Sequence, residues 1–227
     1  MLRMTCAVVA PLMLCAAPVS LLAAGEPTAQ GVLFDARHLD QISKGAEVTY
    51  RFERKVSDEA ILGKPFSDEI KLGVTQINDK GEREVVIKIF TGEYARDPFN
   101  LPELTVNPLF HWYFDRSVRT YSQLTSASVP YLHAKFRAAL RDKAQIESIK
   151  FDYNGHSIDA YRVSVSPFAG DPNASKMDGF DGSHFTMVVS NDAPGYILDM
   201  VAYFESRKAG APHLEERISL VGMGDAK

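Results

Sequence analysis

A two-residue alternation of apolar and polar side chains constrains the fold of this chain more than any other feature. Residues 46–53 show it most cleanly, with apolar or aromatic side chains at every even position and charged or hydroxyl side chains at the odd ones. This pattern predicts a β-strand with one buried face and one solvated face. Strand-like segments follow at residues 70–74 and 83–90, on either side of the turn sequence Asn78–Gly81. We therefore expect an antiparallel meander in the first third of the chain.

The second half of the chain carries similar strand signals. Asn154-Gly155 joins two strand-like runs, and this dipeptide is the strongest short signal for a β-hairpin. Residues 167–183 are rich in Gly, Asp, Asn and Pro and predict a loop. Residues 196–204 are apolar on both faces, so we expect a strand that is covered on each side and lies near the centre of the sheet. Other strands are expected at residues 149–153, 158–165, 185–189 and 214–221.

Two helices are predicted in the middle of the chain. The first begins at Asn107-Pro108, where Asn is a good N-cap and Pro suits the first turn, and it has a wide aromatic face. The second follows Ser128, which is expected to cap it, and runs to about Lys143. A shorter amphipathic helix is predicted over residues 32–43. The fold class is therefore α+β, with a curved antiparallel β-sheet, a half-barrel, crossed by two or three helices.

The first 25 residues have the layout of a secretory signal peptide. Arg3 gives a positive start, an apolar run follows, and small residues end it, so we expect cleavage after Gly25 or Ala24. Residues 26–227 are then interpreted as a single β-rich domain, long enough to bury a substantial core. We expect this domain to be exported to the periplasm of a Gram-negative bacterium.

Composition excludes several classes of function. Both cysteines, at positions 6 and 15, lie in the leader, which removes thiol catalysis, Cys-ligated zinc and iron–sulfur clusters from the mature chain. Loss of the leader leaves 24 Lys and Arg residues against 29 Asp and Glu residues, and this negative balance disfavours a nucleic-acid partner. No G-x-S-x-G, H-E-x-x-H, Walker or dinucleotide-binding motif is present. We expect no catalytic residues, no bound metal and no cofactor.

Aromatic residues after Pro108 surround more than one side of their predicted helix. Core packing explains part of this pattern, and a groove for an acyl chain or an apolar peptide is the functional interpretation. Together with the two-sided strand at 196–204, it predicts a non-enzymatic binding protein that holds a lipid or acylated chain in the concavity of the sheet. The residues expected to bind this ligand are Phe110, Trp112, Phe114, Tyr121, Leu198 and Met200.

Two other interpretations remain open. One is an interaction or scaffold protein of the cell envelope whose concavity is filled by its own side chains. The other is a metal-dependent or acid–base hydrolase built on His111 and Asp115, which share a helix face at four-residue spacing. A positively charged helix face could also meet an envelope protein or an anionic membrane surface, or it could simply be solvated. Its members are Lys135, Arg137, Arg141 and Lys143.

The order of predicted elements behind a signal peptide resembles the lipoprotein-carrier architecture of LolA and LolB. In that architecture a curved antiparallel sheet is crossed by helices that plug its concave side. Several short segments also resemble a group of uncharacterised exported proteobacterial proteins. These segments are Leu33-Phe34-Asp35 through His38-Leu39, Tyr50-Arg51-Phe52, Asn107-Pro108 to Asp115-Arg116, and Ser190 to Gly195. Neither resemblance assigns a role to a residue, because a fold does not imply a function.

Overall fold

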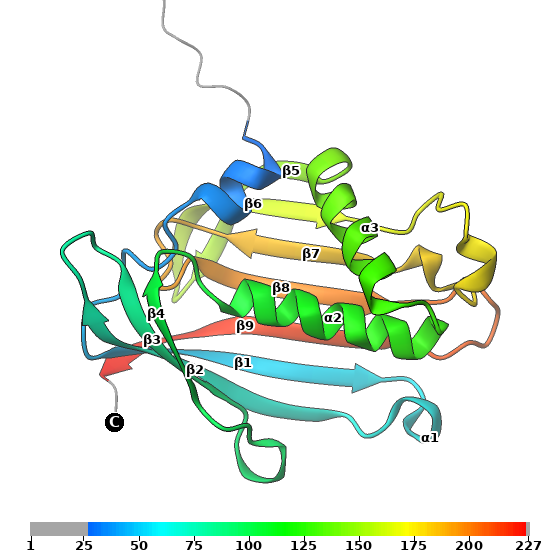
Figure 1. Ribbon diagram of the computed structural model, residues 1–227, viewed down its shortest axis with the longest axis horizontal. Helices are drawn as coiled ribbons and strands as arrows, with labels where there is room; N and C mark the ends of the chain where they lie inside the picture. Colours follow the sequence, from blue (N-terminus) through cyan, green and yellow to red (C-terminus); the bar gives the residue numbers. More distant parts are fainter. Residues whose placement is uncertain (1–26, 226–227) are drawn as a thin grey trace, which may run out of the picture.

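The computed structural model of the protein describes residues 27–225, which form one large antiparallel sheet with helices on one face (Figure 1). The nine strands are β1 Ala46–Val56, β2 Phe66–Ile77, β3 Arg83–Ile89, β4 Phe99–Leu104, β5 Gln145–Tyr153, β6 His156–Val165, β7 His184–Val189, β8 Ile197–Phe204 and β9 Leu214–Asp225. The helices are α1 Glu59–Leu62, α2 Leu109–Thr125 and α3 Val129–Asp142, with helical turns η1 Gly31–Asp35, η2 Gly92–Tyr94, η3 Ala174–Lys176 and η4 Phe180–Gly182. The predicted signal peptide and both cysteines lie outside the described residues.

The strands are arranged in the order β4-β3-β2-β1-β9-β8-β7-β6-β5, and every neighbouring pair is antiparallel. Each half of the chain therefore forms its own meander, and β9 joins the two by pairing with both β1 and β8. The sheet is open, with β4 and β5 at its edges. The predicted α+β fold, a curved antiparallel sheet crossed by helices, is confirmed.

Strand β1 follows the predicted alternation. Val48, Tyr50 and Phe52 are fully buried beneath the helices, while Arg51 on the other face is exposed. A bulge between Thr49 and Tyr50 shifts the register of β1 against β9. Such bulges increase the local twist, which favours curvature of the sheet.

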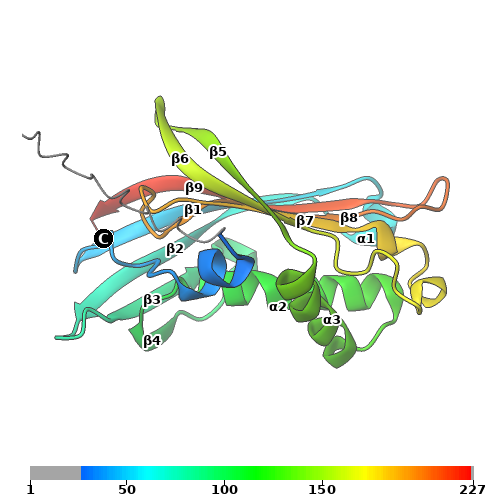
Figure 2. The same cartoon turned by 90° about the horizontal axis from the view of Figure 1, so that it is seen from above.

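Strand β8 is covered on both faces, as its sequence predicts. Helices α2 and α3 lie on one side of the sheet, and the tip of the β5–β6 hairpin rises on the other side (Figure 2). Leu198 packs in a small second apolar cluster with Val188, and Phe151 of the hairpin packs against this cluster. Asn154 and Gly155 both have positive φ values, 53° and 76°, as expected for a tight hairpin turn.

Helices α2 and α3 lie close to their predicted bounds. Asn107 caps α2, since its side-chain oxygen accepts a hydrogen bond from the Leu109 N–H at 3.0 Å. Ser128 occupies the N-cap position of α3, but its hydroxyl makes no capping hydrogen bond, so that detail of the prediction is wrong.

The predicted helix over residues 32–43 is also wrong beyond its first turn. Helical structure ends at Asp35, and the chain then follows an irregular path toward β1. The reason is a set of long-range contacts: the Leu39 N–H bonds the Thr105 carbonyl, and His38 stacks on Tyr196 with ring centroids 4.3 Å apart. These contacts replace the intrahelical bonds that a continuous helix would need.

Candidate functional site

A buried cluster of ion pairs stabilises the packing of α2 on the middle of the sheet. Glu216 of β9 is completely buried and accepts hydrogen bonds from the Arg116 guanidinium at 2.7 and 3.1 Å, and also from Arg54. The Tyr113 hydroxyl donates to the Glu216 carbonyl at 2.7 Å, and the Arg116 guanidinium lies 4.7 Å from the centre of the Phe52 ring. A buried carboxylate needs such partners, because burial without them is very unfavourable. The cluster thus fixes where α2 packs on the sheet.

Alternation along β9 predicts that Glu215 and Glu216 point to opposite faces. The structure confirms this, since Glu215 pairs instead with Lys55 at 3.3 Å. The arginine partners of Glu216 could not be predicted from the sequence, because they lie 162 and 100 residues away in the chain.

A second cluster of polar groups connects α2 to α3. Asp115 accepts a hydrogen bond from Arg119 at 2.7 Å and faces the His133 ring nitrogen of α3 at 3.3 Å. The hydrogen bond from Arg119 lowers the pKa of Asp115 below its usual value, and His133 adds to this effect. The predicted pairing of Asp115 with His111 does not form. Within residues 27–225, no three His, Cys, Asp or Glu side chains gather closely enough to hold a metal ion.

The segment before β1 is held by buried polar contacts under η1. The Nδ1 atom of His38 accepts the Asn107 N–H at 3.1 Å, and burial lowers the pKa of His38 to about 4. The Asn107 amide also donates to the Tyr50 hydroxyl at 3.0 Å and to the Gly195 carbonyl at 2.8 Å. The Tyr196 hydroxyl donates to a carbonyl of η1 at 2.8 Å. Residues from four distant parts of the sequence therefore set the position of this segment.

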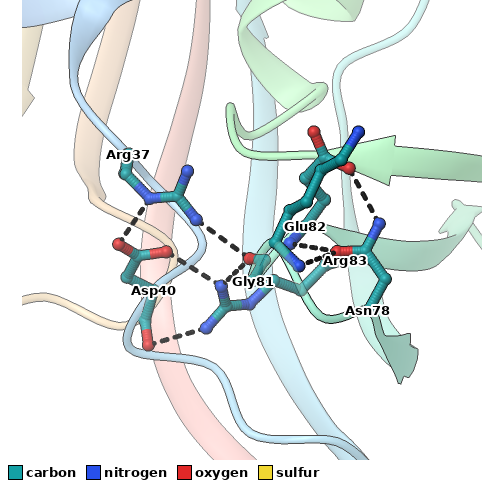
Figure 3. A network of polar contacts seen from close by, with 7 residues as sticks. Arg37, Asp40, Asn78, Gly81, Glu82 and Arg83 are labelled. Carbon is teal, nitrogen blue, oxygen red and sulfur yellow. Dashed lines mark hydrogen bonds and ion pairs between the residues drawn. The ribbon is translucent and has the colours of Figure 1, made fainter.

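A further network ties the same segment to the β2–β3 turn (Figure 3). Arg37 donates to Asp40 at 2.8 Å and to the Gly81 carbonyl at 2.9 Å. Arg83, which is buried, donates to the Asp40 carboxylate at 2.9 Å and to its carbonyl at 3.0 Å. Within the turn, Asn78 accepts the Glu82 N–H at 2.9 Å. The segment is thus held at Val32 and at residues 37–40, which keeps η1 beside the helices.

A cleft of about 580 Å³ lies between η1, α2 and α3. It is lined by Gln30 and Phe34 of the N-terminal segment, by His111, Phe114 and Val118 of α2, and by His133, Phe136, Arg137, Leu140 and Arg141 of α3. No strand residue contributes to this lining, so the cleft lies in the helical layer and not against the sheet.

The floor of the cleft is aromatic and aliphatic. The Phe114 and Phe136 rings meet edge to face with centroids 5.3 Å apart, and Phe34 lies 6.4 Å from Phe114. Val118 and Leu140 are buried beside them. Phe34 is 37% exposed, which is a large value for an aromatic ring and leaves apolar surface open at the mouth of the cleft.

Only one of the six predicted ligand-binding residues, Phe114, lines this cleft. Phe110, Tyr121 and Met200 are buried in the main core between the helices and the sheet. The Tyr121 hydroxyl donates to the Phe180 carbonyl at 2.7 Å, which gives the ring a structural role.

The other two predicted residues lie elsewhere. Trp112 packs half-buried against Phe52 and Phe90, with centroids 6.3 and 5.8 Å away. Leu198 faces the opposite side of the sheet from Met200, because it is the extra residue of a bulge in β8, opposite Val188 and Val189 of β7, and this bulge interrupts the alternation. The six residues therefore do not converge on one cavity.

The four residues of the predicted cationic face of α3 make two different kinds of contact. Lys135 pairs with the buried carboxylate of Asp171 at 2.9 Å, and Lys143 donates to a loop carbonyl at 3.3 Å. Arg137 and Arg141 instead lie along the cleft. Phe34, Phe136 and Leu140, which complete the cleft with these arginines, could not be identified from sequence, because each belongs to a pattern typical of ordinary core packing.

No helix within residues 27–225 is both long and apolar enough to cross a membrane. No family model matches the chain, and no curated protein does. Among solved structures, the lipoprotein LppX of Mycobacterium tuberculosis is similar over 77% of this chain and 84% of its own, with 12% identity and a TM-score of 0.30. A likeness of this degree supports no argument about ligand or activity. The described residues form an open antiparallel sheet, and the layer of helices on it contains an apolar cleft.

Proposed function

We propose that the protein is a non-enzymatic binding protein that holds an apolar chain, from a lipid or an acylated molecule, in the cleft between η1, α2 and α3. The proposal places it in the periplasm of a Gram-negative bacterium, after removal of the leader. The observation that carries the proposal is the apolar floor of the cleft, made by Phe34, Phe114 and Phe136, and left open to solvent at Phe34.

The size and chemistry of the cleft support this function. Its volume, about 580 Å³, lies within the range of roughly 300–1,000 Å³ that small-molecule sites occupy. Covering the exposed part of Phe34 with a hydrocarbon chain removes apolar surface from water, which is favourable. The site lies in the helical layer because side chains such as Tyr113 and Tyr121 already fill the space between the helices and the sheet.

The test uses mature protein purified from the periplasm, extracted with organic solvent and examined by mass spectrometry for lipid. Displacement of a fluorescent hydrophobic probe by dodecanol then measures affinity in wild type, in Phe34→Glu and in the matched control Phe99→Glu. Phe99 has the same side chain and a similar exposure, 36%, but lies on β4 outside the cleft lining.

We expect extracted lipid from the wild type and an affinity at least about fivefold lower in Phe34→Glu, because a carboxylate at the mouth disfavours an apolar chain. Phe99→Glu is expected to bind as the wild type does. A lipid-free protein without a displaceable probe, or equal losses in the two variants, contradicts the proposal.

One observation favours a second candidate function. The side chains of α2 fill the concave face of the sheet, as expected of an interaction or scaffold protein of the envelope. If the cleft binds no apolar molecule, this function is favoured, and crosslinking in the periplasm should then recover a protein partner.

A further inference from the structure

Two parallel stripes run along α3 beside the cleft. Leu132, Phe136 and Leu140 repeat at four-residue spacing and form an apolar stripe, of which Phe136 and Leu140 line the cleft while Leu132 is fully buried. His133, Arg137 and Arg141 follow each of them by one residue and form a polar stripe beside it. Since residues four apart lie on the same side of a helix, the polar stripe borders the apolar floor along two turns.

This polar stripe carries unbalanced positive charge. Among residues 27–225, Arg137 makes no ion pair and no side-chain hydrogen bond, and it is exposed at the edge of the cleft. Arg141 shares only the exposed carboxylate of its neighbour Asp142, at 2.7 and 2.8 Å. Neither arginine is therefore engaged by a buried acid.

The carboxylates near the other two walls already have partners: on the η1 side, Asp35 accepts a hydrogen bond from Gln30 at 2.9 Å. Helix α2 presents His111 at the other wall, and the carboxylate of Asp115 is already bound by Arg119 and His133. The cleft thus combines an apolar floor with a cationic edge, a distribution of charge that complements an amphiphile with a negative head group.

Resting on the proposed function, we propose that the ligand is a single-chain amphiphile with an anionic head, either a carboxylate or a phosphate. Its chain lies on Phe34, Phe114 and Phe136, and its head is bound by Arg137 and Arg141. Guanidinium groups match carboxylate and phosphate oxygens in charge and geometry.

The experiment compares amphiphiles that share a chain and differ in the head: dodecanoate, dodecyl phosphate, dodecanol and dodecyltrimethylammonium, each below its micelle concentration. Calorimetry or probe displacement on the mature protein gives the affinities. We expect at least one anionic amphiphile to bind about tenfold more tightly than dodecanol, and the ammonium to bind most weakly. The tighter of the two anionic compounds identifies the head-group chemistry.

Variants assign this preference to the arginines. Arg137→Gln is expected to lower the affinity for the preferred anion about fivefold and to leave that for dodecanol within about twofold. The matched control is Arg51→Gln, which removes the same charge from an exposed arginine of β1, on the face turned away from the helices. This control is expected to retain the wild-type affinities.

Equal affinities for dodecanol and both anions overturn the inference while the proposed function stands, and failure of every amphiphile to bind overturns both. Equal losses in Arg137→Gln and Arg51→Gln also overturn the inference. A further outcome also overturns the inference: no monomeric amphiphile binds, and Phe34→Glu still binds anionic vesicles. The arginines would then contact a membrane surface instead.

Discussion

His38 is expected to make the stability of the protein depend on pH in the weakly acidic range. Its ring is 1% exposed, accepts the Asn107 N–H through Nδ1, and stacks on Tyr196 with an interplanar angle of 2°. Its Nε2 atom has no hydrogen-bond partner within residues 27–225. Protonation of Nδ1 would break the bond from Asn107 and place a charge in an apolar environment, and burial accordingly lowers the pKa from 6.5 to about 4.

The sign and size of the effect follow from the two pKa values. Between pH 4 and 6.5 the unfolded chain binds the proton more readily than the folded one, so stability falls as pH falls through this window. The full difference corresponds to about 3.4 kcal/mol, of which about 2.5 kcal/mol is lost between pH 7.5 and 4.5. Above about pH 7.5 the contribution no longer changes with pH.

Urea unfolding at pH 7.5 and 4.5 measures this loss in wild type, in His38→Asn and in the control His111→Asn. His38→Asn removes the titrating ring while keeping a side-chain acceptor, and its pH-dependent loss should be smaller than that of wild type by about 2.5 kcal/mol. His111 is exposed, and its variant should retain the wild-type dependence. An identical pH dependence in His38→Asn, or a His38 NMR titration midpoint near 6.5 in wild type, refutes the reasoning.

Two further substitutions test the contacts that position the site. Gly195→Ala should reduce the free energy of unfolding by about 3 kcal/mol, because φ is +75° and the new methyl would collide with the buried Tyr50 hydroxyl. Gly155→Ala, at φ +76° with nothing within 4 Å, should lose only about 1 kcal/mol, and equal losses in urea unfolding would contradict the collision. Glu216→Ala should lose about 3–5 kcal/mol, because it leaves two partly buried arginines without their carboxylate. The control Glu215→Ala should have a free energy of unfolding within about 1 kcal/mol of wild type. A loss as small as this in Glu216→Ala would refute the role of the ion cluster.

Most of the sheet could be predicted from sequence because its signals are local. The alternation in β1, the Asn154-Gly155 turn and the two-sided burial of β8 each depend on residues within one strand or hairpin. The start of α2 could be predicted for the same reason, since Asn107 lies only two residues before Leu109, whose N–H it binds. The order of the strands was not predicted, because β9 pairs with β1 across almost the whole length of the chain.

The site itself could be predicted only in part. The aromatic face predicted for α2 includes Phe114, which lines the candidate cleft, but Phe34 and Phe136 join it from other segments and have ordinary core patterns of their own. The path of residues 36–45 depends on contacts such as that of His38 with Tyr196, which no local signal reveals. Leu198 and Met200 are two residues apart and yet face opposite sides, because the bulge against β7 leaves Leu198 as an extra residue in β8, which no local signal reveals.

The position of the bound chain tests the central claim most directly. A dodecanoate derivative with a diazirine near the end of its chain can be photocrosslinked to the mature protein, and the labelled residues identified by mass spectrometry. The account predicts labelling of cleft residues such as Phe34, Phe114 and Leu140, abolished by excess unlabelled dodecanoate. Displaceable labelling confined to strand residues such as Met200, or labelling that dodecanoate does not displace, would contradict it.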